Sequence, residues 1–145
     1  MGGKGNEGVA ANVSRTKGAL GYVEYAYAKR NKIPAMALQN KDGNYVMPDD
    51  ETFAAAAAGA DWFSVPGMGL SIVNQPGAKA YPVTTASFIL MYKEPANKAE
   101  SAEVLKFFDW AFKNGKGMAT DLDYVPLPDA LTAQIRQRVF SQINT

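Results

Sequence analysis

Residues 18–28 read GALGYVEYAYA, and this stretch indicates the fold class. Gly18 favours a turn, residues 19–23 are apolar enough for a short buried strand, and a helix is expected to begin near Glu24. A strand that runs directly into a helix is one step of an alternating β/α pattern, and such patterns build parallel sheets. The sequence therefore predicts an α/β fold.

The other expected helices follow from caps and apolar faces. Asn6 is the predicted N-cap of the first helix, and Pro128 is the predicted N1 residue of the last one. The strongest helical pattern lies at residues 101–114, where apolar side chains recur at the spacing of one face. The full set of expected helices spans residues 7–15, 24–31, 48–58, 101–114 and 128–143.

Three further strands are expected. Residues 36–38 and 45–47 flank the dipeptide Asp42-Gly43, which is a strong signal for a hairpin turn. Residues 81–92 form the longest strand candidate, and the apolar run FILMY at 88–92 predicts that its end is buried. Residues 61–80, which are rich in proline and glycine, are expected to form an irregular surface loop.

The composition limits the possible functions. The 145 residues are 47% hydrophobic and carry a net charge of +1, so we expect a folded domain with no strong attraction to nucleic acid or acidic lipid. The chain has no cysteine and no histidine, which removes disulfides, thiol chemistry and the commonest general base. Without cysteine and histidine, most hydrolase and zinc chemistry is disfavoured. No apolar run approaches the ~18 residues of a membrane span.

Three runs together resemble a known family. The first is residues 18–28, the second is EVLKFFDWA at 103–111, and the third is DLDY at 121–124 with Leu127-Pro128 after it. They resemble the solute-binding proteins of ABC phosphate-uptake systems, in the order and at about the spacing found there. The resemblance covers essentially the whole chain.

This resemblance implies a partial periplasmic-binding-protein fold of type II, made of pieces of two lobes joined by a crossing strand. Residues 1–82 would be the later part of the second lobe, and residues 83–145 the crossing strand and closing helices of the first. The start at Met1-Gly2-Gly3-Lys4, without a signal peptide, is expected to be an internal cut of an exported, periplasmic protein. The missing N-terminal half, or self-association, would then cover the open sheet edges.

In the resembling proteins, phosphate is held by backbone amides, Ser and Thr hydroxyls, one Arg and one Asp. Those ligands precede the point at which this sequence begins, and no Arg-x-x-x-Ser-Gly-Thr segment occurs here. The expectation is therefore that this segment holds no phosphate-binding, catalytic or metal-binding residue. The intact protein would deliver inorganic phosphate to the membrane subunits of an ABC permease, without a cofactor and without enzyme activity.

Four groups of residues could form alternative sites. GKGNEG at residues 3–8 matches the dinucleotide fingerprint, but no strand precedes it, so a glycine-rich helix entry is expected. The hydroxyls of Thr84, Thr85 and Ser87 could meet an anion, although a strand start explains them as well. The pair Asp121 and Asp123 is expected to form a solvated turn. The last group is a small basic patch, expected to be a solvated helix end, made of Lys29, Arg30 and Lys32.

The tyrosines, one glycosylation sequon and the carboxylates suggest other possible sites and functions. The tyrosines of residues 22–27 could form a binding platform but are expected to pack, and the sequon at 12–14 lies in a predicted helix. A self-associating structural or interaction module of the same descent is the alternative to a receptor segment. An enzyme would have to use carboxylates that form no paired, spaced set, namely Glu24, Asp109 and Asp121.

Overall fold

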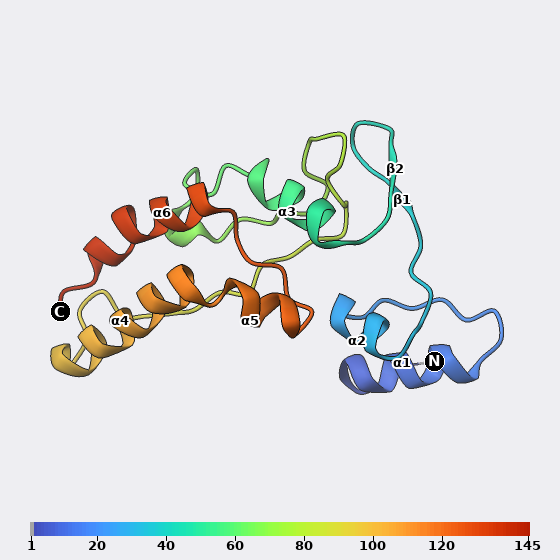
Figure 1. Cartoon of the computed structure of the whole chain (residues 1–145), viewed down its shortest axis with the longest axis horizontal. Coiled ribbons are helices and arrows are strands. Elements are labelled where there is room, and N and C mark those ends of the chain that lie inside the picture. The colour runs from blue at the N-terminus through green and yellow to red at the C-terminus, as the bar shows by residue number, and fades with distance from the viewer. Residues whose placement is uncertain (1) are drawn as a thin grey trace.

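A computed structural model describes residues 2–145 and leaves Met1 outside the described part. Figure 1 shows a helix-rich, elongated molecule in which α1 and α2 form a separate unit at one end. Helices α3 and α6 lie near each other in the other part, with α4 and α5 running alongside. Among residues 2–145, no helix combines the length and apolarity needed to cross a bilayer.

The first helix, α1, spans Gly5–Arg15 and confirms the helix predicted here. Its expected cap is wrong, because Lys4 is the N-cap residue and makes no side-chain capping bond. Asn6 instead accepts a hydrogen bond at Oδ1 from the backbone N–H of Glu24, at 2.9 Å. This bond ties α1 to the start of α2, which spans Tyr25–Arg30 as predicted.

The buried strand predicted at residues 19–23 is wrong. These residues form no strand, and Leu20 and Tyr22 are 83% and 90% exposed. Gly21 does approach α1 closely, since a Cβ at this position would lie 2.7 Å from Cγ2 of Val13. The physical reason for the difference is that a strand needs a neighbouring strand, and within residues 2–145 none lies beside this segment.

The predicted hairpin is confirmed. Strand β1 spans Leu38–Gln39 and pairs antiparallel with β2, Tyr45–Val46, with Leu38 opposite Val46. Gly43 supplies the positive φ of +86° that the turn requires. Asn40 lies 5% exposed at the base of the turn, and its Nδ2 donates to the carbonyl of Ala78 at 3.0 Å. The same amide reaches the carbonyls of Gly77 and Ala80, so the hairpin is fastened to residues 77–80.

Helix α3, Asp50–Ala58, begins and ends as predicted. Asp49 accepts from the backbone N–H of Thr52 at 2.8 Å, and the Thr52 hydroxyl accepts from the N–H of Asp49, which makes a capping box. Gly59 follows as the C-cap. These local signals are sufficient to define the helix.

The loop at residues 61–80 is irregular as predicted, apart from the short 3₁₀ turn η1, Pro66–Met68. It supplies Trp62 and Ile72, the two most buried residues of the main apolar cluster. Trp62 is 5% exposed and donates from Nε1 to the carbonyl of Ala57 at 2.7 Å. The buried cluster consists of Ala57, Trp62, Ile72 and Leu131. It joins residues from both sides of the predicted boundary at 82/83.

The strand predicted at residues 81–92 is wrong for this chain. No strand forms there, and the run at 88–92 is largely exposed, with Leu90 at 91% and Tyr92 at 83%. Across residues 2–145, no hydrogen bond between main-chain groups involves residues 83–92. The segment is extended and apolar but has nothing to pair with.

The C-terminal helices differ from the prediction in their ends. Helix α4 spans Lys98–Asn114 and begins at Asn97, which accepts from the N–H of Glu100 at 3.1 Å. An unpredicted helix, α5, spans Lys116–Asp121. Helix α6 spans Asp129–Arg138 with Pro128 as N-cap rather than N1, and a 3₁₀ turn, η2, follows at Phe140–Gln142. The last helix is therefore shorter than predicted.

The one sheet in the described residues 2–145 is the two-stranded antiparallel hairpin. A parallel sheet is thus not formed by this chain on its own. Helices joined to a small sheet remain consistent with part of an α/β fold.

Candidate functional site

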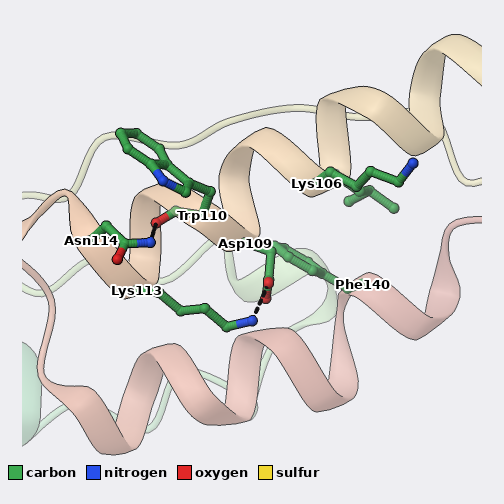
Figure 2. A pocket seen from close by; sticks show the side chains of 7 residues that line it. Lys106, Asp109, Trp110, Lys113, Asn114 and Phe140 are labelled. Carbon is green, nitrogen blue, oxygen red and sulfur yellow. Dashed lines mark hydrogen bonds and ion pairs between the residues drawn. The ribbon is translucent and has the colours of Figure 1, made fainter.

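One hollow on the surface, with a volume of about 370 Å³, lies between α4 and the turn η2 that follows α6. In Figure 2, Asp109 and Lys113 extend from α4 toward the facing C-terminal helix, whereas Trp110 points to the other side of α4. The lining residues are Leu105, Lys106, Asp109, Trp110, Lys113, Asn114 and Phe140. We call this hollow the α4–α6 groove.

One carboxylate in the α4–α6 groove takes two cations. Asp109 pairs with Lys113 of its own helix at 2.5 Å and with Arg136 of α6. Hydrogen bonds from Lys113 and then Arg136 hold the pKa of the Asp109 carboxyl below its usual value. The carboxylate therefore stays charged at neutral pH and connects the two helices.

A second hollow of about 380 Å³ lies beside the first and is lined by Lys113, Lys116, Asp129, Thr132 and Arg136 among others. Its third cation, Lys116, pairs with Asp129. Each cation facing the two hollows thus has a carboxylate partner, and an incoming anion would have to displace it. The arrangement fits a structural tie between α4 and α6 better than an anion site. Among residues 2–145, no three carboxylates gather as a metal site would require.

The glycine-rich loop at residues 3–8 forms the entry to α1, as the sequence suggested. The helix begins inside the loop at Gly5, and a Cβ on Gly3 would lie 2.4 Å from the backbone of Gly8. The two ends of the loop therefore pack against each other, with no room for a side chain at Gly3. It offers no strand-to-helix turn of the kind that cradles a pyrophosphate.

The hydroxyl cluster of the predicted strand is not brought together. Thr84 is 8% exposed and its Oγ1 donates to the carbonyl of Tyr81 at 2.8 Å, whereas Thr85 and Ser87 are exposed. The tyrosines behave differently from one another as well. Tyr22 is exposed, while the Tyr25 ring packs edge-on against Phe53, with centroids 5.3 Å apart.

Two groups that sequence reasoning kept apart meet in the structure. Asp123 pairs with Lys29 at 2.7 Å and with Arg30 at 3.4 Å, so the predicted solvated turn and the predicted solvated helix end contact each other. The Asp123 side chain is only 17% exposed, which corrects the expectation for this residue. The opposite charges were visible in the sequence, but no pattern linked positions more than ninety residues apart.

The remaining candidates have structural roles or none. In α1 the sequon residues bond to nearby carbonyls: Asn12 donates to Gly2 at 3.3 Å and Ser14 to Ala10 at 2.8 Å. Asp121 is exposed, and in residues 2–145 it forms no ion pair. The carboxylate of Glu24 raises the pKa of the Tyr124 hydroxyl, which places the two near each other.

Comparison with known proteins gives a consistent result along the whole sequence. The chain is 51% identical over 145 residues to the phosphate-binding protein PstS of Pasteurella multocida, which covers all of this chain and 42% of that protein. It is 49% identical over 138 residues to PstS of Haemophilus influenzae, covering 95% of this chain and 41% of that one. The chain matches a segment of the PstS phosphate-binding proteins. No family model matches it.

The match extends to an archaeal protein, the PstS of Methanocaldococcus jannaschii, at 34% identity over 139 residues. The family resemblance predicted from the three sequence runs is therefore confirmed. The chain spans about two fifths of the length of these relatives. Such relatives imply a periplasmic-binding-protein fold, of which this chain has a part.

Proposed function

We propose that this chain is part of a phosphate receptor that delivers inorganic phosphate from the periplasm to the membrane subunits of an ABC permease. The observation that carries the proposal is the identity of about one half, sustained over the whole chain, to proteins named for phosphate binding. Those relatives are binding proteins, which favours a receptor role over catalysis. The receptor itself would be a protein of the relatives' length.

Within such a receptor, this segment supplies scaffold and not phosphate ligands. Three observations support this role. The cations of the α4–α6 groove are paired with carboxylates, the Thr84 hydroxyl is bonded to the carbonyl of Tyr81, and Gly3 packs closely against Gly8 in the loop at 3–8. A phosphate site needs donors that are free to face the anion and that no other partner has satisfied. We therefore place the phosphate ligands in the part of the receptor outside this chain.

The two extended segments are proposed to be strands in the receptor. Residues 19–23 and 83–92 are apolar, and in the described part of the chain residues 20–23 and 83–92 make no main-chain hydrogen bond to another main-chain group. Unpaired backbone with apolar side chains is what a strand presents when its neighbours are missing. In the receptor, residues 1–82 would complete one lobe and residues 83–145 the other, with the strand that begins at residue 83 crossing between them.

A chimera tests the receptor proposal. The segment of the Pasteurella multocida protein that matches this chain is replaced by this chain, and phosphate binding is measured by calorimetry with sulfate as the control anion. We expect selective phosphate binding close to that of the parent protein, because the ligands come from the unchanged part. A chimera that unfolds cooperatively on heating but does not bind phosphate would contradict the proposal.

The same calorimetry on the 145-residue chain tests where the ligands lie. We expect no heat with phosphate, since the segment holds scaffold alone. Selective binding by the isolated chain would overturn this part of the proposal and direct attention to Thr84 and the loop at 3–8.

A second candidate function is a self-associating structural or interaction module. The exposure of Leu90 and Tyr22, both at least nine-tenths, favours it, because exposed apolar segments drive association. Sedimentation over a range of concentrations separates the two candidates. A chimera that is a monomer and binds phosphate supports the receptor, whereas a chimera that oligomerises without binding supports the module.

A further inference from the structure

The C-terminal ends of α2 and α5 meet end to end, far apart in the sequence. Besides the two ion pairs of Asp123, Nη2 of Arg30 donates to the carbonyl of Leu122 at 2.8 Å. Both helix ends carry the partial negative charge of unpaired carbonyls, so they would repel each other without cations between them. Lys29 and Arg30 lie at this position, and Arg30 satisfies the Leu122 carbonyl at the end of α5.

The end of α5 has the hydrogen bonds of a Schellman motif. The N–H of Asp123 donates to the carbonyl of Thr120 at 2.9 Å, and the N–H of Tyr124 donates to that of Ala119 at 2.8 Å. Asp123 occupies the position at which glycine is favoured, with φ at +63°. A non-glycine residue in this left-handed region has a steric cost, and such a cost is often associated with a functional role for the side chain.

The end of α2 repeats this arrangement. Lys32 has φ at +53°, its N–H donates to the carbonyl of Lys29 at 3.1 Å, and the N–H of Ile33 donates to that of Ala28 at 2.9 Å. Both helices therefore stop in a fixed geometry, and their last side chains are held toward each other. The junction is built from two defined caps and does not depend on flexible loops.

The junction has features that distinguish it from an ordinary surface ion pair. One carboxylate, 17% exposed, is shared by two cations, and one of those cations also binds a helix-end carbonyl. The ammonium of Lys29 lies 5.8 Å from the ring centroid of Tyr25, which further limits its position. Networks of this kind hold two elements together better than isolated exposed pairs do.

The contacts of α2 divide into two kinds. The Tyr25 ring meets Phe53 of α3, which belongs to the same predicted part of the chain, residues 1–82. Asp123 supplies the ion pairs that join α2 to the predicted second part, residues 83–145, beside the bond from Arg30 to the Leu122 carbonyl. Loss of the Asp123 carboxylate would leave fewer contacts between the two parts, and the unit of α1 and α2 would be freer to pivot about the aromatic contact.

We propose that Asp123, Lys29 and Arg30 form an ionic clasp that fixes the unit of α1 and α2 against the connection between α5 and α6. The clasp sets how the neighbouring segment at residues 19–23 is presented for strand pairing, a consequence that rests on the proposed function. Asp123 is a positioning residue here. It contacts no ligand, and its effect is on the arrangement of the two parts.

Spin-label distances test the clasp on the full chain. Because the sequence lacks cysteine, Arg15→Cys on α1 and Gln137→Cys on α6 give two unique labelling sites. The distance distribution is measured by double electron–electron resonance in the parent chain, in Asp123→Asn and in the matched control Asp121→Asn. Both substitutions remove one negative charge from the same turn, but only Asp123 has partners.

We expect one narrow distance peak in the parent and in Asp121→Asn, and loss of that peak in Asp123→Asn. The variant Asp123→Gly removes the carboxylate but suits the backbone at φ +63°, so its cap and its fold are retained. It should also lose the narrow peak. A narrow, unshifted peak in both Asp123 variants would overturn the clasp. Since no phosphate is involved, failure of the receptor proposal would leave this result unchanged.

Discussion

Residues 38–80 and the extended segments at 19–23 and 83–92 are equally apolar in places, yet they behave in opposite ways. In the first region Trp62 and Ile72 are 5% and 2% exposed, and Asn40 fastens the hairpin to the following loop. In the extended segments Leu20 and Leu90 are 83% and 91% exposed. The difference lies in what each region has to pack against.

The first region packs with partners that are near in sequence. The hairpin closes through residues 40–44, α3 is capped by its own first residues, and Trp62 bonds to Ala57 five positions before it. A single strand has no such local option, because its backbone groups need a neighbouring strand if they are to be buried. Apolar composition therefore predicts burial, but the burial requires that the partner be part of the chain.

The largest effect on the stability of the chain is expected at Trp62, in the buried region. Trp62→Ala removes the largest side chain of the core and its bond to Ala57, and we expect a loss of about 3–5 kcal/mol in the free energy of unfolding. Urea denaturation followed by circular dichroism measures this loss. The matched control is the other tryptophan, Trp110, which is 47% exposed. If Trp110→Ala costs as much as Trp62→Ala, the placement of the core is wrong.

A smaller effect is expected at Asn40. Asn40→Ala leaves the carbonyls of residues 77, 78 and 80 without their donor, and we expect a cost of about 1–3 kcal/mol. Asn44→Ala in the same turn is the control, because Asn44 contributes backbone bonds to Asn40. Amide exchange of residues 77–80 should rise in Asn40→Ala alone. Equal exchange in the two variants would contradict the role of Asn40.

The tie between α4 and α6 should make stability depend on pH. The pKa of Asp109 is lowered in the folded chain, so its contribution is fully present above its unfolded pKa of about 3.9 and is lost as the pH falls through the lowered folded value. Thermal unfolding between about pH 6 and 2 measures this loss. Asp109→Asn should flatten part of the decline. An unchanged slope in this variant would show that the ion pairs with Lys113 and Arg136 do not form in solution.

The smallest effect on the stability of the isolated chain is expected at Leu90, in one of the extended segments. Leu90 is 91% exposed, so Leu90→Lys should change the free energy of unfolding of the monomer by less than about 0.5 kcal/mol. In the chimera with the Pasteurella multocida protein, the same substitution should be strongly destabilising, because the side chain would be buried beside a neighbouring strand. Equal, small effects in both contexts would contradict the strand assignment.

The sequence was sufficient wherever the structure is determined locally. Asp42-Gly43 predicted the hairpin, and the helix expected at residues 48–58 contains α3. The helix expected at residues 101–114 was also found, although its start at Asn97 was missed. Prediction from the sequence failed where contacts between residues far apart in the chain determine the structure. Residues 19–23 and 81–92 have the composition of strands, but their pairing cannot be read from composition.

The contact of Asp123 with Lys29 and Arg30 was equally out of reach. Each charged group was visible, and each had an ordinary interpretation as a solvated surface. Their meeting depends on where α2 and α5 end, and the end of α5 depends on a left-handed aspartate that no sequence signal announced. The ion pairs of the α4–α6 groove likewise depend on how the two helices pack, which the spacing of residues in the sequence does not show.

Amide hydrogen exchange of residues 85–92, compared between the isolated chain and the chimera, shows whether the extended parts of this receptor segment become strands only beside the rest of the receptor. We expect unprotected exchange in the isolated monomer and strong protection in the phosphate-binding chimera. Protection in the isolated monomer, or its absence in a folded and phosphate-binding chimera, would contradict this expectation.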